Sequence, residues 1–139
     1  MLSSSKFVVA LHILAVLAHR GGRDPVCSKL IAQSVGTNPV VIRRLMTALE
    51  QAHLVVSTAG RHGGFALAKP SSAISLADVY KAVEDNRLFK PHASPPNDKC
   101  PVGARIQKAL ETPLQTAQEG LLAALAGSTL DDIAAGVAA

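Results

Sequence analysis

The sequence predicts a mainly helical protein that carries one small β-hairpin. Of its 139 residues 48% are hydrophobic but only 3% are aromatic, so the core must consist of aliphatic side chains. Apolar residues recur at helical spacing in several segments, whereas residues 54–70 combine two short β-prone runs with a glycine-rich centre. A chain of this length forms one domain, or a small domain with an appendage.

The first predicted helix covers residues 4–19 and is mostly buried. Its apolar run from Phe7 to Ala18 follows Lys6 and superficially resembles the core of a signal peptide. His12 interrupts the run, which is also too short to span a bilayer, and we expect no cleaved leader and no membrane contact. The two cysteines, Cys27 and Cys100, are consistent with a reducing cytoplasm rather than with a disulfide framework.

Residues 28–44, SKLIAQSVGTNPVVIRR, have the organisation of a helix-turn-helix. Ser28 is the expected N-cap of the first helix, and Gly36 can end that helix in the left-handed conformation. Asn38 can then cap a second helix that has Pro39 at its first position. The apolar residues on one side of the first helix are Leu30, Ile31 and Val35.

The second helix of this motif is predicted to have one apolar and one basic face. The apolar stripe, expected to be buried, consists of Ile42, Leu45, Met46 and Leu49. The opposite face carries Val40, Arg44, Thr47 and Gln51, with Arg43 beside it. A helix face with two arginines and so little acid suits the phosphates and base edges of a DNA groove. The alternative is that Arg43 and Arg44 are ordinary solvated arginines.

Residues 54–70, LVVSTAGRHGGFALAKP, predict a hairpin directly after the second helix. Residues 54–56 and 65–67 form the strands, and the glycines between them permit the backbone conformations of a tight tip. Arg61 and His62 lie at that tip, where basic groups can reach an adjacent minor groove or the DNA backbone. An incidental polar loop is the alternative. Helix-turn-helix and hairpin together predict a winged helix-turn-helix that binds double-stranded DNA.

The distribution of charge agrees with this prediction. Residues 1–70 contain eight lysines and arginines but two acidic residues, a net charge of +6, whereas the remaining residues sum to −2. The half that contains the motif is therefore the half that attracts a polyanion.

The second half begins with a capping box, Ser75 to Asp78, which starts a helix that ends near Glu84. Residues 87–100 contain three prolines and predict a flexible loop, and residues 101–126 predict a long helix in which Pro113 causes a kink near Leu110 or begins a new helix. A last short helix follows residue 129. We therefore divide the chain into a DNA-binding domain (1–86), a loop (87–100) and a C-terminal part (101–139).

The long helix has more apolar length than its own domain can cover. It predicts a homodimer, which would place two DNA-reading helices one DNA turn, or a multiple of it, apart on a palindromic operator. The alternative is a helix that packs within its own chain.

Three segments, TNPVVIRRLM, GRHGGFALAKP and ISLADVYKAVE, together resemble the Rrf2 family of bacterial winged helix-turn-helix regulators, the IscR, NsrR, CymR and YwnA type. The likeness covers nearly the whole chain. It implies a homodimeric regulator, usually a repressor, with the sensor and the dimer helix in the C-terminal half. The match places these residues on the DNA-facing helix and the wing: Thr37, Asn38, Val40, Arg43, Arg44, Thr47, Arg61 and His62.

The sensor region departs from the family pattern. Cluster-binding relatives have three clustered cysteines there, whereas Cys100 stands alone in NDKCPVGARIQ, so we predict no iron–sulfur cluster and no other cofactor. Cys100 is a possible redox sensor because it precedes a predicted helix and has Lys99 and Arg105 nearby; an idle cysteine is the alternative.

Other classes of function have less support. The five histidines show no pair at metal-binding spacing, so no metal site is predicted. No nucleophile with its base and no phosphate cradle is visible, which argues against an enzyme. A winged helix that binds protein or RNA remains the alternative to a DNA-binding regulator. The sequence indicates no effector.

Overall fold

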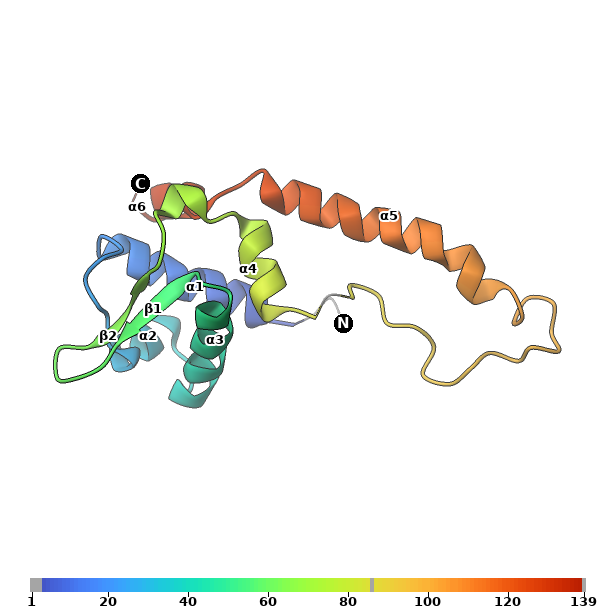
Figure 1. Ribbon diagram of the computed structural model, residues 1–139, viewed down its shortest axis with the longest axis horizontal. Coiled ribbons are helices and arrows are strands. Elements are labelled where there is room, and N and C mark those ends of the chain that lie inside the picture. The colour runs from blue at the N-terminus through green and yellow to red at the C-terminus, as the bar shows by residue number, and fades with distance from the viewer. Residues whose placement is uncertain (1–3, 86, 139) are drawn as a thin grey trace.

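The computed structural model describes residues 4–85 and 87–138. These residues form a helical head, made of residues 4–85 and the last helix, and an arm, residues 87–126, that extends away from it (Figure 1). The elements are α1 (Lys6–His19), α2 (Ser28–Val35), α3 (Pro39–Gln51), β1 (Val55–Thr58), β2 (Gly64–Leu67), the 3-10 helix η1 (Ser71–Ala73), α4 (Leu76–Val83), α5 (Ile106–Ala126) and α6 (Leu130–Ala138).

The core of the head is aliphatic and centres on α1. Ile13 and Leu14 are completely buried, and they belong to one cluster with buried residues of α2, α3, β1, α4 and α6. The stripe predicted for α3, Ile42, Leu45, Met46 and Leu49, is buried in this cluster, which confirms the assignment of its two faces. Burial of each such side chain stabilises the fold by about 1.5–3 kcal/mol.

The helix-turn-helix forms with one correction. Gly36 ends α2 with a left-handed φ of 74°, and Asn38 Oδ1 accepts a 2.8 Å hydrogen bond from the N–H of Val40, as predicted. The N-cap of α2 is Cys27 rather than Ser28, and no side chain caps this helix end. The reason is that Val26 pairs with β2, which keeps the chain extended through Cys27 so that the helix begins at Ser28.

The predicted hairpin is an antiparallel pair of strands, β1 and β2, in which Val55 lies opposite Leu67 and Thr58 opposite Gly64. Gly60 has a φ of 102° at the tip, where a glycine is required. His53 also has a positive φ, 60°, at the point where the chain turns from α3 toward β1. This turn and the tip together fix the direction in which the hairpin projects from the head.

In the second half of the chain the predicted capping box is confirmed, whereas the predicted start of the long helix is wrong. Ser75 Oγ accepts from the N–H of Asp78, and the Asp78 carboxylate accepts from the N–H of Ser75, both at 3.0 Å. Residues 101–105 form turns, so α5 begins at Ile106, five residues later than predicted. The helix then continues through Pro113 without a new start. Its exposed surroundings allow water to satisfy the carbonyl that the missing proline N–H leaves free.

The last helix returns to the head. Leu130 of α6 is completely buried, and its N–H donates a 2.8 Å hydrogen bond to the carbonyl of Ile74. Ile133 also packs against the core. The division of the chain at residues 86 and 100 remains a prediction, and residue 86 lies outside the described residues. Within the part that is described, no helix has the length and hydrophobicity needed to cross a membrane.

Candidate DNA-binding surface

The outward face of α3 presents the residues that the sequence singles out. Arg43, Arg44 and Thr47 are exposed, Val40 is 45% exposed and Thr37 is half-buried. The Thr47 hydroxyl donates a 2.9 Å hydrogen bond to the carbonyl of Arg43 and keeps its lone pairs free to accept. Asn38 is exposed too; its Oδ1 caps the helix, but its amide N–H₂ group has no hydrogen-bond partner among the residues that the structure describes.

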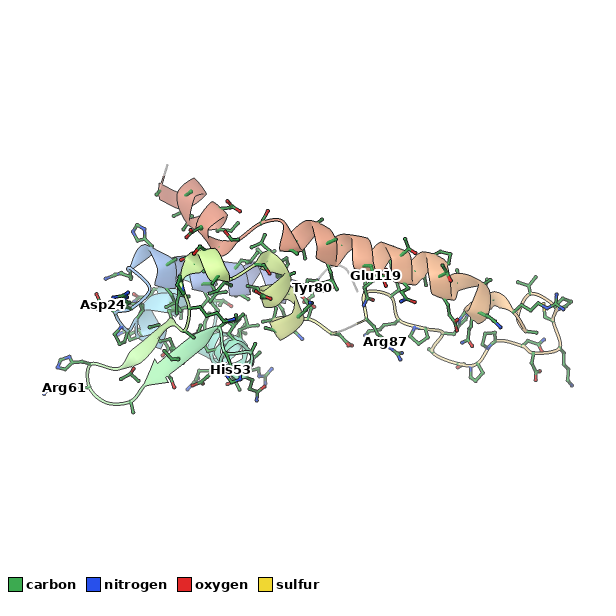
Figure 2. All side chains as sticks on the ribbon, turned by 45° about the horizontal axis from the view of Figure 1, so that its top comes forward. Asp24, His53, Arg61, Tyr80, Arg87 and Glu119 are labelled. Carbon is green, nitrogen blue, oxygen red and sulfur yellow. The ribbon has the colours of Figure 1, made fainter. Side chains whose placement is uncertain are left out.

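The tip of the hairpin carries a second basic group of side chains. Arg61 and His62 are exposed, and Arg61 projects from the end of the hairpin into solvent (Figure 2). Within residues 4–85 and 87–138, the guanidinium groups of Arg43, Arg44 and Arg61 make no ion pair or side-chain hydrogen bond. A cation without a protein partner remains available to a phosphate.

Two contacts that the sequence analysis missed attach the hairpin to the helix-turn-helix. The backbone N–H and carbonyl of Val26, just before α2, form two hydrogen bonds with Phe65 of β2, at 2.8 and 2.9 Å. Ser57 of β1 donates a 2.7 Å hydrogen bond to Glu50 Oε1 near the end of α3. Each contact joins residues of different secondary-structure elements, so neither follows from the pattern of a single element. They hold α2, α3 and the hairpin as one surface.

A shallow groove between α2 and α3 adds residues that the sequence analysis did not assign. Ser28, Lys29 and Gln33 of α2 line it together with Thr37 and Arg43. Lys29 is exposed and extends the basic surface from α3 onto the first helix of the motif. The start of α2 also offers backbone N–H groups that no side chain caps, which favours an anion there. The only sequence signal for this groove was the basic charge of residues 1–70.

Cys100 belongs to the turns of residues 98–105, a segment in front of α5 at the end of the arm away from the head (Figure 1). The backbone N–H groups of Gly103 and Val102 donate to its sulfur and lower the pKa of the thiol below its ordinary value. The turn is closed by hydrogen bonds from the N–H of Cys100 to the Asn97 carbonyl, 3.2 Å, and from the N–H of Ala104 to the Cys100 carbonyl, 2.9 Å. The thiol is exposed.

Comparison with known proteins identifies this arrangement. A sequence profile described as "Rrf2: Iron-dependent Transcriptional regulator" matches residues 3–136. This chain belongs to the Rrf2 family. The resemblance inferred from its three motifs is thereby confirmed, as is the winged helix-turn-helix fold.

Individual Rrf2 relatives match over most of their length. YwnA of Bacillus subtilis, named as an HTH-type transcriptional regulator, is 40% identical over 131 residues, which cover 94% of this chain and 95% of YwnA. A crystal structure of a protein described as DNA-binding has a TM-score of 0.73 and 36% identity, over 93% of this chain and 98% of that one. CymR of B. subtilis, described as a global cysteine regulator, has a TM-score of 0.63 and 26% identity, and the match covers 95% of each chain.

The iron in the Rrf2 description can be tested against the donor atoms of this chain. Cys27 directly precedes α2 in the head, whereas Cys100 belongs to the turns in front of α5, within the arm. Among the described residues, no three His, Cys, Asp or Glu side chains gather as a metal site would require. An iron–sulfur cluster normally takes four protein ligands, mostly thiolates. The residues of this chain therefore do not fit an iron–sulfur cluster.

Proposed function

We propose that this Rrf2 protein is a homodimeric repressor that binds a palindromic DNA operator with α3 and the hairpin. The observation that carries the proposal is the set of exposed guanidinium groups of Arg43, Arg44 and Arg61, which have no acidic partner within the described residues. Residues at the N-terminal part of such a helix read base edges in the major groove, while a basic hairpin tip follows the backbone or the minor groove. The protein acts in the cytoplasm by binding, not by catalysis.

The proposed DNA contacts divide between base edges and phosphates. Arg44, in the middle of the exposed face of α3, reads a base edge, and Val40 contacts a thymine methyl group. Arg43 and Arg61 bind phosphates and set the orientation of the protein on the duplex. The remaining contacts, which position the helix and the hairpin, come from Thr37, Asn38, Thr47 and His62.

The arm supports a dimer. No residue of α5 is buried within this chain, although Ile106, Leu110, Leu114, Leu121 and Leu125 follow one another along the helix at spacings of four or seven residues. Leu110 is 37% exposed and Val102, just before the helix, is 67% exposed. A second copy that packs along this stripe would remove apolar surface from water. Sedimentation should therefore detect a dimer that Leu110→Glu converts to a monomer.

Binding to fluorescent duplexes, selected from a random pool for tight binding, tests the DNA contacts. The logarithm of the association constant should fall linearly with the logarithm of salt concentration, with a slope of about −0.9 for each phosphate neutralised. Arg44→Ala should cost about 1–3 kcal/mol and relax sequence preference, whereas Arg43→Ala and Arg61→Ala should weaken binding to all duplexes alike. Lys108→Ala, which removes an exposed charge from the arm, is the matched control.

Two results would contradict this assignment. One is an affinity for duplex DNA that does not change with salt. The other is tight binding of single-stranded RNA, or of a protein, by variants in which Arg43, Arg44 and Arg61 are all replaced by alanine.

We also propose that oxidation of Cys100 changes the affinity for the operator. The supporting observation is the exposed sulfur that accepts hydrogen bonds from the N–H groups of Gly103 and Val102, because these donors favour the reactive thiolate. Peroxide would convert the thiolate to a sulfenic acid, with release of hydroxide, and the added oxygen would disturb the turn in front of α5. The spacing of two DNA-binding heads depends on that helix.

Comparison of wild type with Cys100→Ser and Cys27→Ser tests this regulation. Peroxide should change the operator affinity of wild type and of Cys27→Ser, but not that of Cys100→Ser. An equal response of wild type and Cys100→Ser would refute a sensory role for this thiol.

A further inference from the structure

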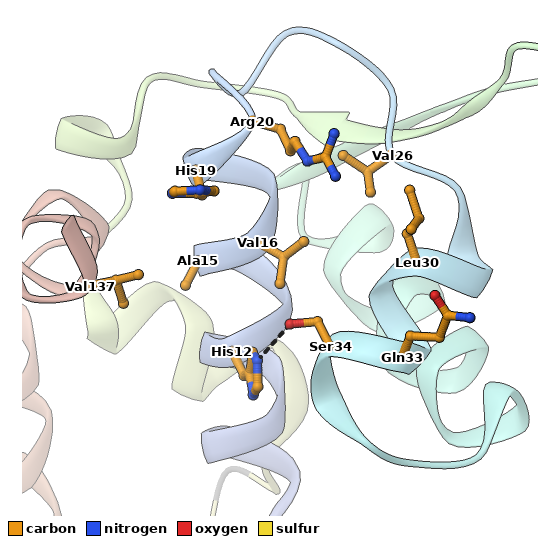
Figure 3. Close-up of a pocket in the computed structure, with 10 residues that line it drawn as sticks. All are labelled: His12, Ala15, Val16, His19, Arg20, Val26, Leu30, Gln33, Ser34 and Val137. Atoms are coloured by element: carbon orange, nitrogen blue, oxygen red, sulfur yellow. Dashed lines mark hydrogen bonds between the residues drawn. The ribbon is translucent and has the colours of Figure 1, made fainter.

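A groove of about 500 Å³ crosses the exposed face of α1, between α2 on one side and α6 on the other (Figure 3). It does not overlap the face of α3, the hairpin tip or the arm. Its volume lies in the range of sites that hold small organic molecules. Of its lining residues, Gln33 alone also borders the groove between α2 and α3 described above.

The polar rim of the groove is basic. His12 and His19 lie two turns apart on one face of α1, and Arg20 follows at the end of the helix near His19 (Figure 3). Arg20 carries a permanent charge, and its guanidinium has no ion pair among the residues that the structure describes. His12 Nε2 and Ser34 Oγ are hydrogen-bonded at 3.1 Å, which joins α1 to α2 at the other end. Among the described residues that line the groove there is no aspartate or glutamate.

The floor of the groove is apolar and partly open to solvent. It consists of Ala15 and Val16 of α1, Val26, Leu30 of α2 and Val137 of α6. Leu30 is 42% exposed and Val137 is 59% exposed. The sequence pattern placed Leu30 on the same side of α2 as Ile31. Leu30 lies at the edge of this groove, because α2 is held on α1 by Ile31 and Ala32.

We propose that this groove binds a small carboxylic acid whose aromatic or aliphatic body rests on Val16, Leu30 and Val137. Its carboxylate would lie at the end of the groove that holds Arg20 and His19. A planar guanidinium is suited to a carboxylate, and an apolar body would cover the side chains that now face water. The absence of acidic side chains from the lining selects an anion over a cation.

Ligand binding in the groove would affect the DNA-binding surface through Val26. This residue lines the groove and also forms the two backbone hydrogen bonds with Phe65 that attach the hairpin. The other wall is α2, which packs against α3. A ligand that shifts α2 or Val26 therefore changes the position of the hairpin relative to α3. This regulatory step, but not the binding itself, rests on the proposed function.

Nuclear magnetic resonance with the full chain tests the binding without DNA. Titration with 2-naphthoate should shift the amide signals of residues that line the groove, with a dissociation constant of about 1 mM or lower. The neutral analogue 2-naphthamide and the variant Arg20→Gln should each weaken binding roughly tenfold. Arg23→Gln, which removes an exposed arginine three residues away that does not line the groove, should bind as wild type does.

Three outcomes would overturn the proposal: no shifts at about 10 mM naphthoate, equal binding of the amide and the acid, or equal binding by Arg20→Gln and wild type. Conversion of a dimer to a monomer by Leu30→Glu would also overturn it, since a second copy would then cover the groove. DNA affinity with and without naphthoate is measured separately. Loss of DNA binding in all samples, with naphthoate still bound, would refute the proposed function and leave this site intact.

Discussion

Replacement of Gly64 by alanine should detach the hairpin from the helix-turn-helix. A Cβ at this position would clash with the backbone carbonyl oxygen of Val26, and it would lie 2.6 Å from the Val26 carbonyl carbon and 2.9 Å from the N of Cys27. Gly64 also has a φ of 152°, which side-chain-bearing residues rarely adopt. All three neighbouring atoms belong to the backbone, so no side-chain rotation can relieve the clash.

The loss of stability follows from the contacts that must break when the hairpin and the Val26 segment separate. The strand and the Val26 segment can move apart only if the two hydrogen bonds between Val26 and Phe65 lengthen or break. Each such bond stabilises a folded protein by about 0.5–1.5 kcal/mol, so the free energy of unfolding should fall by about 1–3 kcal/mol. Replacement of glycine by alanine at a compatible position stabilises a protein by about 0.4–1 kcal/mol through a less flexible unfolded chain, but alanine is strained at the φ of Gly64, so this gain does not apply here.

Urea unfolding followed by circular dichroism measures this difference. Gly136→Ala is the matched control, because Gly136 lies within α6 and a Cβ there meets open space. It should raise the free energy of unfolding by up to about 1 kcal/mol. A Gly64→Ala protein at least as stable as wild type would refute the argument that this glycine permits close approach of the two segments.

Three further predictions follow from single contacts. Leu130→Ala should lower the free energy of unfolding by about 2–5 kcal/mol in urea, because this completely buried side chain attaches α6 to the core; a loss below about 1 kcal/mol would contradict that attachment. Ser57→Ala removes an exposed bond to Glu50 and should cost less than about 1 kcal/mol in the same assay, while Ser57→Thr should retain it. In a Cys27→Ser background, alkylation of Cys100 by iodoacetamide should rise with pH and reach half its maximal rate at a lower pH in the folded chain than in concentrated urea. The sign follows because the N–H groups of Gly103 and Val102 lower the pKa of the thiol only when the turn is formed; coincident profiles would exclude this effect.

The features that the sequence predicted correctly depend on neighbours within a few residues. Gly36 ends α2, Asn38 caps α3 and the Ser75 capping box starts α4, and each of these interactions closes within four positions of the chain. The apolar stripe of α3 is periodic and therefore also visible in the sequence. Local chemistry and periodicity were sufficient to locate the helices that carry the predicted DNA contacts.

The features that were missed depend on partners far away in the chain. No residue near Val26 indicates that it pairs with Phe65, and that pairing places the N-cap of α2 at Cys27, one residue before the expected Ser28. The burial of Leu130 depends on Ile74 and α1, which are more than fifty residues distant. Leu30 satisfies the helical period but lies at the edge of a groove, because periodicity gives the side of a helix and not how far its neighbour extends over it.

Glu50 shows why residue charge alone does not define the DNA-binding surface. It is the one acidic residue of α3. The net charge of the helix alone does not tell whether Glu50 lies on the same surface as Arg43 and Arg44. The structure instead engages its carboxylate with Ser57 of β1 at the C-terminal end of the helix, about two turns beyond Arg43. The N-terminal half of α3 is therefore left basic and exposed, beside the start of α2 and the residues Lys29 and Thr37. On the proposed function that half of α3 would read bases, while the acid at the other end of the helix holds the hairpin.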